Sequence, residues 1–281
     1  KEQKEMALAI ADFIMPVTPA KRSCYEPSMN KDGIYWGQHA GVQAVMMAKS
    51  GISGKNPVIL DEKYKEYIDS LGEKFYFFDL YIKFYSCCRW AHSPIKAVKS
   101  LMEENSIKLS EVESVDIYSF GNAGTLYQAT PQNEDEAQYN ILYPIVAQMI
   151  FGECGPLESS TEKMLDSRVK ENIGKVKFHH DEEYDKVFPA KRLSRAEITL
   201  KSGEKFKSRA YEPDGDCNEK VSISDIEKKV LKINGCYSKE DTIQNMIDTI
   251  LNTSYDEPFS GVLKSIQKCA LENNIPNVKH I

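Results

Sequence analysis

The sequence lacks the features that mark a membrane protein or a secreted one. It has no apolar run near the roughly 18 residues that a bilayer-spanning helix needs. Residues 1–5 are charged and have no apolar core of the kind found in signal peptides. The seven cysteines are scattered without paired or regular spacing, which disfavours a disulfide framework and a zinc site. These absences predict a soluble, cytoplasmic protein with reduced thiols.

The sequence also has fewer basic than acidic residues and lacks cofactor and metal motifs, and both features limit the ligands we expect. Basic residues are in the minority, with 36 Lys and Arg against 42 Asp and Glu, and the formal net charge is −6. Nucleic acid is therefore not an expected partner, because tracking a phosphate backbone needs clustered positive charge. The chain also has no Gly-rich strand-to-helix turn and no set of ligand residues at metal-binding spacing. We expect no organic cofactor and no metal.

The hydrophobic pattern that is present changes period twice along the chain. It predicts helices, then a mixed block, then helices again, which is an α+β chain. The simplest arrangement is a helical domain of residues 1–73 and 223–281, with a smaller α/β domain of residues 74–222 inserted into it. Helices are predicted at 2–15, 35–50, 61–72, 93–105, 136–151, 223–234, 239–252 and 259–273, and strands at 75–85, 112–120, 175–180, 195–201 and 205–211.

Residues 84–94 are the most informative stretch, because an arginine and a histidine directly precede a predicted helix start at Ser93-Pro94. The free N–H groups of a first helical turn attract a carboxylate. Arg89 would add a bidentate anchor, and His92 would exchange a proton with the bound acid. The alternatives are a histidine that only caps or packs, and an arginine held in an internal salt bridge.

Other candidate residues favour ordinary roles. His179 and His180 are adjacent in a predicted strand and point to opposite faces, so they cannot hold one metal together. Cys87 and Cys88 lack the two-residue spacer of a thioredoxin-type redox motif, and we interpret them as small buried thiols.

Several segments, in order along the chain, resemble the MmgE/PrpD family, whose members include 2-methylcitrate dehydratases, cis-aconitate decarboxylases and iminodisuccinate epimerases. The central likeness is a strand end followed by a histidine that opens a helix, here residues 85–92. The others are an alanine-rich helix ending in glycine, an alanine–aromatic helix start, a Ser-Gly hairpin and a Pro-Asp-Gly loop. These stand at residues 41–51, 137–143, 202–203 and 213–218.

The resemblance implies a large helical domain with the smaller α/β domain as its lid, and an acid–base active site between them that uses no cofactor. His92 matches the family's histidine, and the family's lysine falls on Lys31 or beside it, on Asn30. Asn140 stands where the family commonly has serine, and Tyr143 completes that motif. His39 lies close enough in sequence to Lys31 to line the same cleft, although a purely structural role is the alternative. The expected site is therefore catalytic His92 and Lys31 with substrate-binding Arg89, Asn140, Tyr143 and His39.

By this resemblance we expect a lyase of the dehydratase kind that acts beside a carboxylate of a small tri- or dicarboxylic acid. Epimerase and decarboxylase activities of the same family remain open. Family members are longer and begin with a helical stretch that this chain lacks, so we expect an incomplete helical domain. The opening helix is apolar on a wide face. This predicts a homodimer or a companion chain, and a non-catalytic, partner-dependent subunit is the alternative to an enzyme. A fragment of a longer protein is a third possibility.

Overall fold

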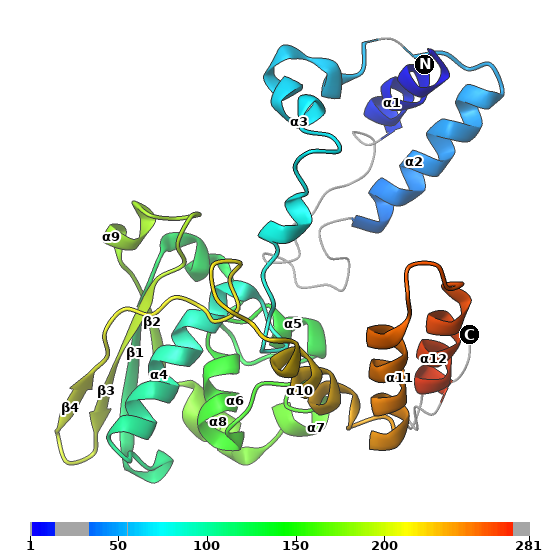
Figure 1. The fold of residues 1–281 in the computed structure, drawn as a ribbon. Helices are drawn as coiled ribbons and strands as arrows, with labels where there is room; N and C mark the ends of the chain where they lie inside the picture. The colour runs from blue at the N-terminus through cyan, green and yellow to red at the C-terminus, as the bar shows by residue number, and fades with distance from the viewer. Residues whose placement is uncertain (1, 15–33, 55, 272–281) are drawn as a thin grey trace.

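The computed structural model describes residues 2–14, 34–54 and 56–271. As the hydrophobic pattern predicts, helices precede and follow a mixed α/β block that contains a four-stranded sheet (Figure 1). The arrangement of residues 74–222 as a lid over a helical domain stays a prediction. The helices are α1 (Glu2–Ile14), α2 (Ile34–Lys49), α3 (Lys65–Asp69), α4 (His92–Glu104), α5 (Glu134–Gln138), α6 (Tyr143–Phe151), α7 (Thr161–Met164), α8 (Ser167–Ile173), α9 (Glu182–Asp185), α10 (Ile223–Asn234), α11 (Glu240–Asn252) and α12 (Ser260–Leu271).

The sheet has the order β2-β1-β3-β4 and is mixed. Its central strand β1 runs parallel to β2 and antiparallel to β3, and β3 and β4 form the predicted hairpin. On one face, Val115 pairs with Ile198 and Ile117 pairs with Ala196, and all four side chains are fully buried. Helix α4 packs against β3 and α6, and α6 packs against α8, so the core lies between this face and these helices. The strands are β1 (Val112–Ser119), β2 (Val176–His180), β3 (Ser194–Leu200) and β4 (Lys205–Lys207).

Three buried serines join the start of α4 to the sheet. The Ser194 hydroxyl lies 2.8 Å from the Ser93 hydroxyl and 2.7 Å from the Ser119 hydroxyl. The Ser93-Pro94 start predicts Ser93 as the N-cap, and this is wrong, because the helix begins at His92 and its N-cap is Ala91. The Ser93 hydroxyl bonds across to β3 instead, because a fully buried hydroxyl needs a partner. This network sets where the first turn of α4 lies.

The predicted strand at 75–85 is absent. Residues Tyr76–Asp79 form a 3₁₀ turn, and Phe77 and Phe78 are 74% and 76% exposed. A strand forms only where a neighbouring strand completes its ladder. Within the described part of the chain, this stretch joins a distant segment by one backbone hydrogen bond, from the Ile82 N–H to the Gly215 carbonyl. The predicted helix at 61–72 shortens to α3 with a preceding 3₁₀ turn, and the strand predicted at 205–211 ends at Lys207.

The predicted helix at 136–151 is two helices, α5 and α6, separated at residues 139–142. The Asn140 side chain causes this break. Its Oδ1 atom accepts hydrogen bonds from the backbone N–H groups of Leu142 and Tyr143, both at 2.8 Å, and its Nδ2 atom donates to the Ala129 carbonyl at 2.8 Å. Asn140 therefore satisfies the free N–H groups at the start of α6, which the preceding helix would otherwise have bonded.

The terminal helices form pairs. Helices α1 and α2 pack together, as do α11 and α12 (Figure 1). Each pair leaves large apolar side chains exposed, among them Val42 (62%) and Met46 (59%) on α2 and Leu263 (48%) on α12. Scattered apolar residues are normal on a surface, but a concentration along several helices marks an interface.

We propose that a second copy of this chain covers these helices, and we expect the purified chain to scatter light as a species heavier than its 31.9 kDa monomer mass. The Val42→Ser/Met46→Ser double variant removes two exposed apolar side chains from one face of α2, so it should shift the mass toward the monomer. Leu165→Ser, at a 62% exposed site outside these helices, is the control and should have no effect. A monomeric wild type would contradict the proposal.

Asn140→Ala should lower the free energy of unfolding by about 2–4 kcal/mol, because it removes a cap and leaves buried N–H and carbonyl groups unpaired. The matched control is Asn133→Ala. Asn133 caps α5 through one bond to the Glu136 N–H, but it is exposed, so its loss should cost only about 1 kcal/mol. Urea unfolding measures both values. Equal losses in the two variants would show that the buried contacts of Asn140 contribute nothing beyond ordinary capping.

Candidate functional site

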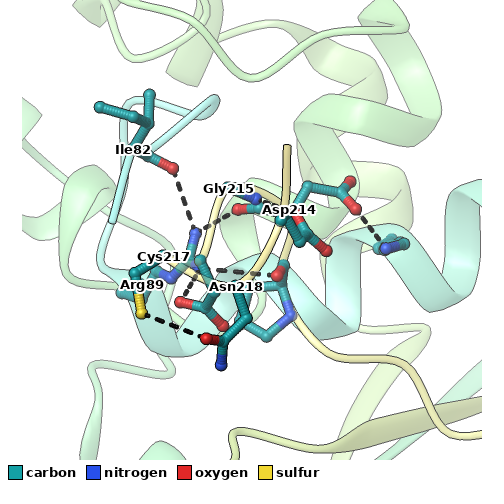
Figure 2. A network of polar contacts seen from close by, with 10 residues as sticks. Ile82, Arg89, Asp214, Gly215, Cys217 and Asn218 are labelled. Carbon is teal, nitrogen blue, oxygen red and sulfur yellow. Dashed lines mark hydrogen bonds and ion pairs between the residues drawn. The ribbon is translucent and has the colours of Figure 1, made fainter. Parts of the chain in front are cut away.

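Arg89 lies in the 3₁₀ turn before α4 and is 4% exposed. Figure 2 shows its guanidinium surrounded by acceptors from two segments far apart in the sequence. It bonds to the Asp216 carboxylate at 2.6 Å, to the Ile82 carbonyl at 3.3 Å and to the carbonyls of Asp214 and Pro213. The planar fork of arginine suits such a set of acceptors, which lysine cannot reproduce.

The loop at residues 213–216 fits closely against this arginine. Gly215 has a φ of +86°, and a Cβ atom there would lie 2.3 Å from the Ile82 carbonyl oxygen, so only glycine is accommodated. Lys96, one turn into α4, pairs with the Asp214 carboxylate. The Pro-Asp-Gly loop picked out in the sequence is thus a clamp that holds residue 82, Arg89 and α4 together.

These contacts give Arg89 the internal salt bridge that competed with the anchor role in the sequence. Its NH1 and NH2 groups both bond to protein acceptors, and only its buried Nε–H is without a partner. The positive charge of Arg89 also acts on His92.

His92 is the first residue of α4, but its ring is buried (1% exposed) rather than open to a cleft. The Tyr85 ring packs edge-on against it, with 5.1 Å between the ring centroids. The Nε2 atom has no hydrogen-bond partner. A hydrogen bond to the Cys87 backbone acts on the imidazole, so it must involve Nδ1 as the donor. His92 therefore presents the bare Nε2 lone pair of a neutral ring.

Burial, the largest cause, and the positive charges of Arg89 and Lys83 together lower the pKa of His92 to about 3. The Cys87 backbone bond opposes this shift only partly. The imidazole is thus neutral at every physiological pH. A neutral imidazole accepts a proton from a substrate, whereas an imidazolium cannot.

A cavity of about 490 Å³ lies beside this pair of rings, with Tyr85 in its wall. One side is formed by the 84–86 segment and Lys99 of α4, a second by the 153–158 turn, and a third by α10. His92 does not line this cavity, but Tyr85 touches both. Helix α10 contributes Lys228, Lys229 and Lys232 to the wall.

The structure does not bring the other predicted site residues to this cavity. Asn140 and Tyr143 are fully buried, and their polar groups bond to backbone: Asn140 as described above, and Tyr143 through its hydroxyl to the Glu158 carbonyl. His39 is exposed on α2. Lys31 and Asn30 lie outside the described residues.

Sequence reasoning missed Lys83, Tyr85 and Lys229. Lys83 donates to the Cys87 carbonyl at 3.0 Å and lowers the pKa of both His92 and Lys229 by repulsion. A lysine nine residues before His92 stood in a stretch interpreted as a strand, and nothing in the local sequence connects α10, well over a hundred residues later, with this place. Only the fold reveals these neighbours.

Within the described ranges, no group of three or more His, Cys, Asp and Glu side chains is placed to hold a metal ion. His179 and His180 each bond a separate carboxylate, Asp116 at 2.7 Å and Asp185 at 2.5 Å. In the same part of the chain, no helix combines the length and apolar character needed to cross a lipid bilayer.

Comparison with known proteins gives an independent view. Two cis-aconitate decarboxylases of Aspergillus terreus are similar to this chain. The first, from strain NIH 2624 / FGSC A1156, is 22% identical to this chain, and the match covers 71% of this chain and 42% of the relative. The second is 21% identical, and the match covers 75% of this chain and 45% of the relative. The chain thus spans less than half the length of these relatives. The model of the MmgE/PrpD C-terminal domain matches residues 85–253, which include Arg89, His92 and α10, and the chain therefore belongs to the MmgE/PrpD family.

Proposed function

We propose that this chain takes part in a lyase reaction beside a carboxylate of a small tri- or dicarboxylic acid, with His92 as the acid–base group. The observation that carries the proposal is the His92 imidazole, which is neutral and has an unpartnered Nε2 atom at the start of α4. A buried polar atom without a partner is costly, so its presence in a protein often marks a functional site. Membership of a family of enzymes supports the same reading.

The chemistry follows from the charges around the ring. Removing a proton from the carbon beside a carboxylate produces an enediolate, which needs cations nearby for its stabilisation. The positive charges of Arg89, Lys83 and Lys229 all act on His92. An anionic substrate offsets their repulsion and raises the pKa of His92, which makes the imidazole a stronger base when substrate is present. Because the ring is 1% exposed, the side chains packed around it, which include Tyr85, have to shift before a substrate reaches Nε2.

Dehydration is our first candidate for the reaction, and decarboxylation, the activity named for the two relatives, is the second. Epimerisation requires the same proton removal. A further possibility is that the chain is active only with a companion polypeptide, since it spans less than half the length of those relatives. Lys31 stays the proposed charge partner of His92.

The test is proton exchange followed by NMR in D₂O, with cis-aconitate and a panel of citrate-like tri- and dicarboxylates. The chain is assayed alone and with the N-terminal part of a longer family member added as a separate polypeptide. Deuterium incorporation, loss of water and release of CO₂ distinguish the reactions. His92→Gln should reduce the rate by about 10²–10⁴-fold, the usual contribution of general acid–base catalysis.

His180→Gln is the matched control, because His180 pairs with Asp185 at the end of β2 and has no part in the proposed site. It should retain the full rate. Circular dichroism establishes that both variants fold. Full activity in a folded His92→Gln variant would refute the role of His92, and no exchange under any condition would refute the proposed reaction.

Stability should depend on pH through His92. The ring resists protonation in the folded chain, with a pKa of about 3, whereas in the unfolded chain it protonates near pH 6.5. Its contribution to stability is therefore complete above pH 6.5 and is lost as the pH falls toward 3. Between pH 7 and pH 5 the loss from this residue should be about 2 kcal/mol.

Urea unfolding at pH 7 and pH 5 measures this dependence, and the decrease should be about 2 kcal/mol smaller in His92→Gln than in the wild type. His180→Gln should keep nearly the wild-type decrease. Equal pH dependence in wild type and His92→Gln would mean that the ring protonates freely in the folded protein.

A further inference from the structure

The cavity beside Tyr85 has an uneven distribution of charge. Lys232 pairs with Glu153, and Lys99 lies 3.9 Å from the carboxylate of Glu103. The remaining acidic groups in the wall also accept hydrogen bonds. Glu158 accepts from the Gly155 N–H at 2.8 Å, and the Asp225 carboxylate accepts from the N–H and the hydroxyl of Ser222, the N-cap of α10, at 3.0 and 2.6 Å. The carboxylates of the wall are therefore held by other groups.

Lys229 is different. It projects from α10 into the wall, is partly buried, and has no hydrogen bond or ion pair among the described residues. Burial lowers its pKa, and repulsion by Lys83 lowers it further. Lys228, the preceding residue of α10, is more exposed, also lines the cavity and interacts with Asp225. A half-buried ammonium group that is repelled by another lysine and forms no ion pair is unfavourable, and a bound anion would stabilise it.

The wall also supplies a neutral donor. The Tyr85 hydroxyl has no hydrogen-bond partner among the described residues, and burial raises the pKa of this phenol, so it stays protonated and able to donate. The cavity, about 490 Å³, falls within the range of small-molecule sites, which combine an apolar wall with a few polar groups. Phe84, Pro156 and Ile233 provide apolar wall here.

We propose that this cavity binds a small anion with two or more negative charges, a polycarboxylate or a phosphate, which is held by Lys229 and Lys228 and by the Tyr85 hydroxyl. An anion with two charged groups contacts both lysines at once, whereas a monocarboxylate has one charged group to share between them and therefore binds more weakly. The proposal goes beyond the proposed function, because His92 does not line the cavity. Binding is measured without turnover, so each proposal can fail separately.

The experiment is a titration of the full chain at pH 7, by calorimetry and by amide chemical shifts, with tricarballylate, inorganic phosphate and acetate. Tricarballylate is a tricarboxylate with no hydroxyl group to eliminate. We expect saturable binding of tricarballylate or phosphate, at least 10-fold tighter than that of acetate, and weaker at high salt because charge attraction is screened. The tighter of the two ligands identifies the source of the anion.

Lys229→Gln should weaken the binding at least 10-fold, and Lys229→Arg, which keeps the charge, should stay within about threefold of the wild type. The control is Lys177→Gln on β2, an exposed lysine outside the cavity, which should bind within about twofold of the wild type. Three results overturn the proposal: no saturable binding of either polyanion, unchanged binding in Lys229→Gln, or an equal loss in Lys177→Gln. Failure of Lys229→Arg, which keeps the charge, to retain binding also counts against it.

Discussion

The burial of the Arg89 charge is the constraint on which the rest of this structure depends. A guanidinium that is 4% exposed is tolerated only if protein acceptors replace its lost water, and removing them costs several kcal/mol. The acceptors come from residue 82 and from the loop at 213–216. Their requirement explains why Gly215 must approach the Ile82 carbonyl, and it ties the segment before α4 to the chain that leads into α10.

The same charge determines the state of His92. Burial, the larger effect, and the positive charges of Arg89 and Lys83 all oppose protonation of the ring, so the imidazole stays neutral. The clamp therefore does two things at once: it holds the start of α4 in place, and it keeps His92 a free base. Helix α10 follows the clamp in the chain, and this brings Lys228 and Lys229 to the cavity that Tyr85 shares. The Arg89–Asp216 pair thus joins the segment before α4 to the chain that leads into α10, and the Arg89 charge acts on His92.

The candidate residues show where sequence reasoning succeeds. His92 was found because a histidine before a helix start is a local pattern, and the helix does begin there. Asn140 and Tyr143 were chosen by family resemblance, yet their polar groups bond to backbone. The same polar side chain in such a motif can either bond to nearby backbone groups or bind a substrate. The sequence motif does not distinguish these two roles. Lys229 was not among the predicted site residues, because the group that lowers its pKa by repulsion is Lys83, which is remote in sequence.

The sequence by itself determined the helices α10, α11 and α12, the strands β1 to β3 and the hairpin, because each has a clear hydrophobic period and its own end signals. Only the tertiary structure decided the secondary structure of residues 75–85. Their aromatic residues favour a strand, but strand formation needs a partner, and the Ile82 backbone meets Gly215 instead. The tertiary structure also decided that Arg89 serves the fold. A charged side chain pairs with a group that is close in space, and the sequence separation of 127 between Arg89 and Asp216 puts this pairing beyond any local pattern.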